Sequence, residues 1–173
     1  MCGMRPSYPW ASAPSAAARG ELMTEDDIPQ FGTGMPGLAY SDRPSAYGVA
    51  VNAAARVLVC RRTRGRLLLP GGGVERGESA LDALRREVAE ETGCRVVAAS
   101  ELCRARQFHS HRLAKPPVNK LCHFFAMEVE HDPAIPTERD HQAVWLSAHE
   151  LAATLTFESH RYALQRYFER HRI

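Results

Sequence analysis

A proline followed by three glycines, Pro70–Gly73, separates an apolar strand-like run from a helix-like segment and limits how this chain can fold. The run Leu67–Leu69 should end as a β-strand here, because proline cannot donate a hydrogen bond to a β-ladder. The segment Ser79–Thr92 predicts a helix, with Ser79 as its N-cap and Gly93 where a C-terminal cap belongs. The sequence therefore predicts a strand, a glycine turn and a helix in direct succession.

Strand-like and helix-like runs continue over the rest of the chain. The runs Ala46–Ala53 and Arg56–Arg62, with a small polar turn near Asn52–Ala55, predict a β-hairpin. Further strands are predicted at Arg95–Ala99, Glu101–Phe108, Lys120–Val129 and Ala143–Leu146, and further helices at Ser147–Leu155 and Glu158–Arg170. One helix between strands and two at the end indicate an α/β fold in which a mixed sheet lies between helices.

Residues 1–45 differ in composition from the rest of the chain. They are rich in Pro, Gly, Ala and Ser and have neither helical nor strand periodicity. We predict a largely irregular N-terminal tail or arm over residues 1–45 and one domain over residues 46–173, since the length suits a single core. Met23 is a candidate natural start, in which case the residues before it are an upstream extension.

Charge and cysteine content argue against several classes of protein. The chain has 22 Lys and Arg, 20 Asp and Glu and a net charge of +2, so no global field favours nucleic acid or a membrane. Five cysteines without a C-x-x-C pair speak against a disulfide framework or a structural zinc site. No run approaches the roughly 18 apolar residues of a membrane span, and the N-terminus lacks the apolar stretch of a secretory signal. We therefore predict a cytoplasmic protein with no membrane and no stable nucleic-acid partner.

Three glutamates, Glu87, Glu90 and Glu91, share one sector of the predicted helix, next to its apolar stripe. Like charges at these spacings repel, so the helix gains no stability from them. A cation between them would convert repulsion into binding, and oxygen-only ligands favour Mg²⁺, Mn²⁺ or Ca²⁺ over zinc. Beside glycine backbone, which an anion can approach closely, such a cluster suits a phosphate chain neutralised by divalent ions. Taken alone, the three glutamates could be an ordinary solvated helix face, and the glycines could be an ordinary turn.

Taken together, these residues resemble the Nudix box, G-x5-E-x7-R-E-U-x-E-E-x-G-U, in which U is a bulky apolar residue. The box runs from Gly72 through Glu78 and Arg86 to Gly93, and every fixed position matches. Cys94 stands at the last U, which a buried thiol can fill. The resemblance implies a Nudix hydrolase with an α/β/α sandwich: a mixed curved sheet, a catalytic loop and helix, and C-terminal helices.

The resemblance also implies an activity and a metal site. Nudix hydrolases are Mg²⁺-dependent, with Mn²⁺ as a possible substitute, and cleave the pyrophosphate bond of a nucleoside diphosphate linked to another group. Metal binding is carried over to Glu87, Glu90 and Glu91 and to the carbonyl of Gly71, and catalysis to Glu87 and Glu90. When bound, such metal ions neutralise developing phosphate charge and acidify the attacking water.

The resemblance assigns structural roles as well and leaves the general base open. Arg86 and Glu78 are expected to form an ion pair that holds the loop against the helix, with Gly72 and Gly93 as structural glycines. The base that takes the proton from water is Glu87, or an acid on the loop before the last strand, where Glu138 is preferred to Asp140.

Substrate specificity depends on residues outside the box. Markers of other Nudix subgroups are absent, which favours nucleoside triphosphates, including damaged ones, cleaved to monophosphate and pyrophosphate. Tyr47 and Phe108 are candidates for stacking on a base, although core packing is the alternative for each. One or two arginines of the basic run before the glycine turn, Arg61, Arg62, Arg64 and Arg66, are candidates for clamping a phosphate, Arg62 first among them, although a solvated hairpin is the alternative.

Other hypotheses remain open. A dinucleoside polyphosphate or a nucleotide-sugar is the alternative substrate. A non-catalytic nucleotide-sensing module is the alternative of another class, although all three box glutamates are present. RNA binding by the basic C-terminal segment is a third. We expect a small-molecule nucleotide partner and a monomer or homodimer.

Overall fold

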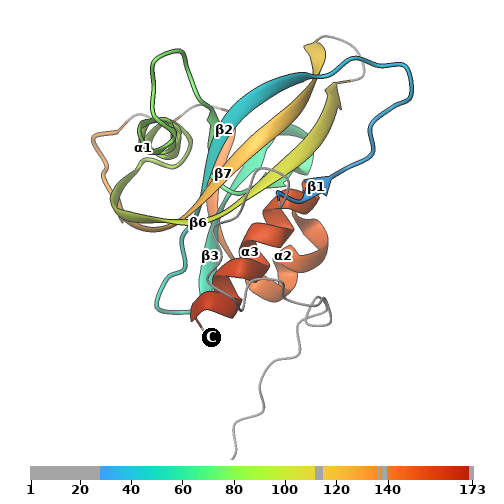
Figure 1. Cartoon of the computed structure of the whole chain (residues 1–173). Coiled ribbons are helices and arrows are strands. Elements are labelled where there is room, and N and C mark those ends of the chain that lie inside the picture. The colour runs from blue at the N-terminus through green and yellow to red at the C-terminus, as the bar shows by residue number, and fades with distance from the viewer. Residues whose placement is uncertain (1–27, 112–114, 136, 138–139, 172–173) are drawn as a thin grey trace, which may run out of the picture.

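Two β-sheets lie between helices in the computed structural model, which describes residues 28–111, 115–135, 137 and 140–171 (Figure 1). The larger sheet has the strand order β1-β6-β7-β2-β5 and contains β1 (Gln30–Phe31), β2 (Ser41–Val49), β5 (Gly71–Gly73), β6 (Cys94–His111) and β7 (Lys115–His131). The smaller sheet has the order β4-β3-β8 and contains β3 (Arg56–Arg62), β4 (Leu67–Leu68) and β8 (His141–Ser147). The helices are α1 (Ala80–Thr92), α2 (Ala148–Thr154) and α3 (Glu158–His171), with a 3₁₀ turn at Thr63–Gly65. This architecture confirms the predicted α/β fold.

The larger sheet is mixed because β2 and β6 each have one parallel and one antiparallel neighbour. Strand β2 runs parallel to β7, with Tyr47 opposite Phe124, and antiparallel to β5. Strand β6 runs antiparallel to β7 and parallel to β1. Side chains of β2 alternate between two cores, since Tyr47 and Val49 belong to one hydrophobic cluster and Ala46 and Ala50 to another.

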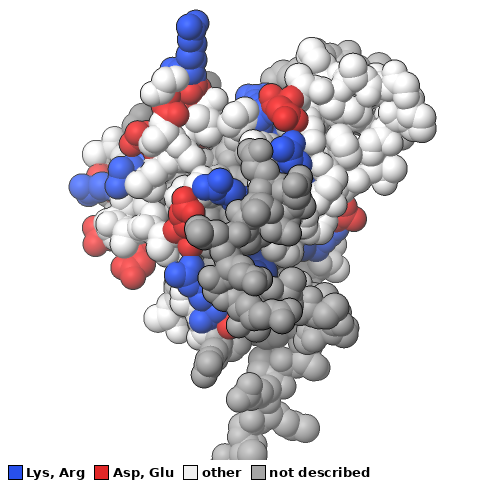
Figure 2. Space-filling view, in the orientation of Figure 1, with Lys and Arg blue, Asp and Glu red and all other residues white. Residues whose placement is uncertain are grey.

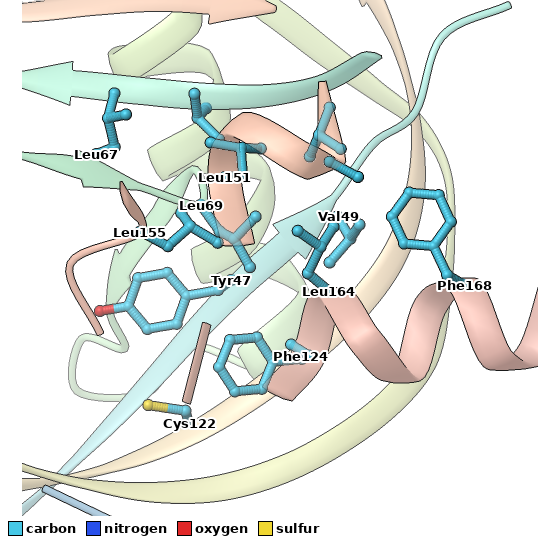
Figure 3. Packing of buried hydrophobic residues seen from close by; sticks show 14 of the residues in the cluster. Tyr47, Val49, Leu67, Leu69, Cys122, Phe124, Leu151, Leu155, Leu164 and Phe168 are labelled. Carbon is cyan, nitrogen blue, oxygen red and sulfur yellow. The ribbon is translucent and has the colours of Figure 1, made fainter. Parts of the chain in front are cut away.

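The helices cover opposite sides of the sheets (Figure 1). Helix α1 contributes Leu84 and Val88 to one hydrophobic cluster, with Leu81 half-buried against it, as its apolar stripe predicts. Helix α3 contributes Leu164 and Phe168 to the other cluster. Figure 3 shows that second cluster, in which residues of the sheets, α2 and α3 pack together. Each predicted amphipathic helix therefore buries its apolar face.

Helix α1 begins and ends where its capping residues predict. The Ser79 side chain accepts a hydrogen bond from the backbone N–H of Asp82, which satisfies one of the free N–H groups of the first turn. Gly93 has φ of 66° and ψ of 20°, the left-handed conformation that glycine adopts at little cost. The box helix is thus fixed at both ends by residues within the motif.

The predicted hairpin is present at its turn but does not extend along the two strands: the Asn52 N–H donates to the Arg56 carbonyl at 2.9 Å and the Leu58 N–H to the Ala50 carbonyl at 3.0 Å. The chain does turn between Val51 and Val57, which form an isolated antiparallel bridge. However, β2 then pairs with β7 and β5, whereas β3 pairs with β4 and β8 in the other sheet. Sequence patterns identify strands and turns but not which of several strands a central strand takes as partner.

Residues 28–45 contribute more structure than an irregular arm. Strand β1 pairs with β6 at Gln30 and Phe31, and β2 already begins at Ser41. The two strands predicted around Ser100 form one long strand, β6, whose pairing with β7 shifts register between Val96 and Ala98 and again between Glu101 and Cys103. Such bulges bend a strand without ending it. The division at residue 45 remains a prediction, and Met23 lies outside the described residues.

The cysteines that the structure describes form no disulfide, and three of them, Cys60, Cys94 and Cys122, are buried. Burial raises the pKa of Cys122 to about 12, so it stays a neutral thiol. These three cysteines therefore act as small apolar side chains of the core. None of the helices described is long and apolar enough to cross a membrane.

Candidate active site

The glycine segment, predicted as a turn, forms the short edge strand β5 against β2. Gly71 pairs with Tyr47 and Gly73 with Ser45. Gly71 has φ of 135°, and a β-carbon at this position would overlap with the carbonyl oxygen of Ala46. Only glycine fits there. The glycine backbone is therefore held in a fixed position next to helix α1.

One arginine of α1 joins this strand to three carboxylates. Arg86 donates hydrogen bonds to both carboxylate oxygens of Glu78, each at 3.0 Å, and to the Gly73 carbonyl at 3.1 Å. Its Nη1 also donates to Oε1 of Glu87 at 3.0 Å and to Oε2 of Glu90 at 3.3 Å. The bond to Glu78 is the main cause that raises the pKa of Arg86, and it lowers the pKa of Glu78. The ion pair between Arg86 and Glu78 is therefore present, and the same guanidinium orients two box glutamates.

The carboxylate of Glu87 lies directly over Gly72. A β-carbon on Gly72 would overlap with the carboxyl group, so this glycine provides the space that Glu87 occupies. The Glu87 side chain is only 18% exposed. Burial raises the pKa of Glu87, with a contribution from the neighbouring charges of Glu91 and Glu90, while Arg86 opposes the shift. Glu87 is thus a carboxylate whose proton affinity exceeds that of a solvated glutamate.

Gly72→Ala is expected to lower kcat by about 10- to 100-fold while the fold is retained, because the new methyl group displaces the Glu87 carboxylate. The measurement is steady-state kinetics together with circular dichroism. Gly34→Ala is the matched control, because a β-carbon there meets only Phe108 at ordinary contact distances, 3.4 Å and longer. Equal kcat for Gly72→Ala and the control would contradict this role of Gly72.

The third box glutamate, Glu91, is the most buried, with a side chain only 1% exposed. Its Oε1 accepts a hydrogen bond from Arg62 and its Oε2 accepts one from the Gly71 N–H at 3.0 Å. Nδ1 of His141, the first residue of β8, lies 3.9 Å from Oε1. Glu91 therefore fixes strand β5 to the helix and to β3, and both of its oxygens are engaged.

Glu87 and Glu90 suit a divalent cation better than Glu91 does. Oε2 of Glu87 and Oε1 of Glu90 have no hydrogen bond to any residue that the structure describes, and the Glu90 side chain is 45% exposed. As the described side chains stand, no three Asp, Glu, His or Cys residues form a group that could hold a metal ion. The oxygen-only donors nevertheless match the preference of Mg²⁺, which keeps several waters and needs few carboxylates. The residues present fit such an ion at Glu87 and Glu90.

Of the two candidates for a general base outside the box, the structure describes Asp140. Glu138 lies outside the described residues. Asp140 is exposed, in the turn before β8. Its neighbour His141 reaches Glu91, so the end of this loop lies beside the box helix. The role of either acid stays a prediction.

The three residues predicted to bind substrate occupy different environments. Tyr47 is 2% exposed, packed on Phe124 and His160, and its hydroxyl lies at the edge of the core cluster (Figure 3). Phe108 is half-buried with its ring centroid 4.7 Å from that of Tyr40. Arg62 is held by Glu91. Core packing, the alternative given for Tyr47, is what the described structure contains.

Sequence patterns missed Lys120 and Phe157, which lie near Tyr47 and beside Arg66 of the predicted basic run. Lys120 Nζ lies 2.7 Å from the Tyr47 hydroxyl, and Arg66 and Lys120 both lie over the ring of Phe157. These residues come from three separate segments with no shared motif. A single lysine in the predicted strand at Lys120–Val129 gave no signal, because its partners are fixed only by the packing of β7 against the loop before α3.

His160 was missed for a similar reason, and it supports the glycine segment. Its side chain is fully buried, and its Nδ1 accepts a hydrogen bond from the Leu69 N–H at 3.0 Å, two residues before Gly71. The acceptor role places the proton of the neutral ring on Nε2. Burial, followed by the charges of Lys120 and two arginines, holds the pKa of His160 well below its usual range.

Replacing His160 with Gln is expected to destabilise the fold most at neutral pH. Because the folded state keeps His160 neutral, the unfolded chain binds more protons once pH falls below the ordinary pKa of about 6.5, and stability declines by up to about 1.4 kcal/mol per pH unit. The difference between wild type and His160→Gln in urea unfolding should therefore shrink from pH 7.5 to pH 5.5. A difference that stays constant over this range would contradict a neutral buried His160.

Figure 2 shows the face of the molecule that is drawn in Figure 1. Acidic and basic side chains are interspersed over the part where α1 lies, which agrees with the small net charge of the chain. No single-sign field covers the visible part of the box helix. Recognition of a charged ligand must therefore depend on local groups rather than on the overall field.

Comparison with known proteins gives consistent matches. The family model of the NUDIX domain matches residues 42–167. Among solved structures, a MutT NUDIX hydrolase from Burkholderia pseudomallei is 25% identical, with a TM-score of 0.59 over 73% of this chain and 98% of that chain. A NUDIX hydrolase from Nitrosomonas europaea is 20% identical, with a TM-score of 0.60 over 75% and 90% of the two chains. The mutator MutT protein from Bacillus halodurans is 21% identical, with a TM-score of 0.58 over 71% and 80%.

Proposed function

Because the chain belongs to the Nudix family and is a Nudix hydrolase, we propose that it cleaves the pyrophosphate bond of a nucleoside triphosphate, normal or damaged, to a monophosphate and pyrophosphate. The observation that carries the proposal is the arrangement of Glu87 and Glu90 on one guanidinium, each with one free oxygen, beside bare glycine backbone.

Glu87 and Glu90 would hold Mg²⁺, or Mn²⁺ in its place, with the Gly71 carbonyl as a further ligand. The bound ion would neutralise phosphate charge and acidify the attacking water. Glu91 is a weaker candidate ligand, because Arg62 and the Gly71 N–H occupy its oxygens. Its role is to position Gly71, and it would need to release Arg62 before it could bind metal.

The chain's own residues account for the proton transfer. A water oxygen attacks one phosphorus of the bridge, the bond from that phosphorus to the bridging oxygen breaks, and the water proton passes to a carboxylate. Glu87 is a candidate acceptor because its carboxylate is held directly over Gly72, beside the site proposed for the metal ion. Arg86 keeps the carboxylate in place. Glu138 and Asp140 are the alternative bases.

A panel of substrates, assayed with Mg²⁺, with Mn²⁺ and with EDTA, tests the proposal. The panel holds normal and oxidised nucleoside triphosphates, ADP-ribose, nucleotide-sugars and diadenosine polyphosphates, and products are separated by ion-exchange chromatography. Metal-dependent release of pyrophosphate is the expected result. Hydrolysis of only a dinucleoside polyphosphate or nucleotide-sugar would replace the triphosphate with the alternative substrate. No hydrolysis by a folded protein would favour a nucleotide-sensing module.

We also propose that the protein acts in the cytoplasm, as a monomer or homodimer, on a small-molecule nucleotide. The buried free thiols support a reducing compartment. The RNA-binding hypothesis loses support from α3, whose Leu164 and Phe168 face the core. Its Arg170 donates to the Glu101 carbonyl at 2.7 Å, so this basic group is already engaged.

A further inference from the structure

Two cations lie on one buried aromatic ring beside the box. Phe157, in the loop between α2 and α3, is 6% exposed. The guanidinium carbon of Arg66 lies 5.5 Å from its ring centroid, and Lys120 Nζ lies 5.1 Å from it. The side chains come from the segment between β3 and β4 and from β7, so the fold brings them together from distant parts of the sequence. We call Arg66, Lys120 and Phe157 the cation pair site.

The described part of the chain supplies no counter-charge to this site. Among the described residues, no carboxylate lies within ion-pair distance of Arg66 or Lys120, and the neighbouring Arg62 is already paired with Glu91. Both cations are half-buried rather than fully solvated. Burial and the charge of Arg62 lower the pKa of Arg66, which agrees with positive charge placed close to positive charge. Partly desolvated cations without counter-charges favour an anionic ligand.

The surroundings strengthen attraction to an anion. The buried rings of Phe157 and His160 have centroids 5.3 Å apart, and the Tyr47 hydroxyl contacts Lys120. Aromatic walls lower the local dielectric constant, and Coulomb interactions are stronger there than in water. His160 is neutral, so it adds no charge of its own.

The cation pair site adjoins the carboxylates through short links. Arg62 connects to Glu91 on one side, and its backbone N–H donates to the Arg66 carbonyl at 2.8 Å on the other. Tyr47, which contacts Lys120, pairs directly with Gly71. The site is therefore next to the buried end of the row formed by Glu90, Glu87 and Glu91.

We propose that Arg66 and Lys120 bind a phosphate of the substrate that lies outside the cleaved bond. The arginine supplies a planar fork for two phosphate oxygens and the lysine a mobile point charge. The ligand class is a nucleotide with a free terminal phosphate or diphosphate, and substrates capped by a neutral sugar or second nucleoside are disfavoured. This inference rests on the proposed function for its choice of substrate.

Equilibrium binding of inorganic pyrophosphate and tripolyphosphate, measured by calorimetry in EDTA, tests the site without hydrolysis. Arg66→Met and Lys120→Met should each weaken binding by about tenfold, and the double variant by more, with the effect largest at low salt. Lys120→Arg should restore much of the affinity. Arg61→Met is the matched control, since Arg61 is exposed, lies beside Arg62 and removes the same charge.

Kinetics separate this inference from the proposed function. Arg66→Met and Lys120→Met should raise the KM for a nucleoside triphosphate about tenfold and leave the KM for a nucleotide-sugar unchanged. If the variants hydrolyse triphosphates with the KM of wild type and bind polyphosphate as tightly as wild type, the cation pair site is overturned. The proposed function then still stands. If the wild-type protein hydrolyses none of the substrates but binds polyphosphate, and the variants lose this binding, the site is supported and the proposed function is overturned.

Discussion

Glu90→Gln is expected to lower kcat by at least about 100-fold with little change in thermal stability. The substitution removes a charge from the candidate metal site but keeps the shape of the side chain, which is half-exposed and whose ion pair among the described residues is with Arg86. A neutral amide is a poor ligand for Mg²⁺ beside a phosphate chain, and charge stabilisation is commonly the largest contribution to such catalysis. Steady-state kinetics over a range of Mg²⁺ concentrations measure the effect, and the Mg²⁺ dependence should shift to higher concentration.

Glu75→Gln is the matched control, because Glu75 is an exposed acid of the same loop and helix region and the change in charge is identical. Its kcat should stay within about twofold of wild type. Near-normal turnover of Glu90→Gln, with unchanged Mg²⁺ dependence, would mean that Glu90 is not a metal ligand. The metal site would then have to be sought at Glu87 with residues outside the described part of the chain.

Arg86→Ala is expected to lower both stability and activity. The substitution removes five hydrogen bonds, to Glu78, Gly73, Glu87 and Glu90. Carboxylates brought together on one guanidinium would then repel one another. Partial exposure moderates the cost, so we expect roughly 2–3 kcal/mol, or about 5–10 °C in Tm. Turnover should fall by more than about 100-fold, because two candidate metal carboxylates lose their position.

Arg85→Ala removes the adjacent arginine and serves as the control. Arg85 is 56% exposed and, within the described part of the chain, forms a long ion pair with Asp82 at 3.6 Å, so its loss should change Tm by no more than about 2 °C. The measurement is the Tm of both variants and of wild type, from thermal melts at low and at high salt. If both arginines behave alike, the network around Arg86 carries no special stabilisation.

Much of the box could be predicted because its information is local. The caps of α1 are encoded by Ser79 and Gly93, and the pairing of Arg86 with Glu78 follows from loop and helix lengths that are fixed in the motif. The apolar stripes of α1 and α3 are visible in the sequence because a helix repeats every 3.6 residues. These features depend on residues fewer than twenty positions apart.

The remaining features depend on contacts between distant segments. The pairing of β2 with β7 rather than β3 is decided by the whole sheet, and the position of Lys120 over Phe157 requires β7 and the loop before α3 to be in place. Glu91 appeared equivalent to Glu87 and Glu90 in the sequence. Helical spacing places Glu91 three residues after Val88 and seven after Leu84, next to the buried stripe. Its partners Arg62 and the Gly71 N–H could not be predicted, because they come from other segments of the chain.

The parallel pairing of β2 with β7 constrains how the chain reaches its native state. Tyr47 cannot acquire its partner Phe124 until most of the domain has left the ribosome, so the central part of the sheet closes late. Non-local parallel strands fold slowly because the closure entropy of a long loop opposes them before any contact compensates. A chain truncated before β7 would expose both faces of β2, which are buried in the complete protein, and we expect it to aggregate rather than to fold in part.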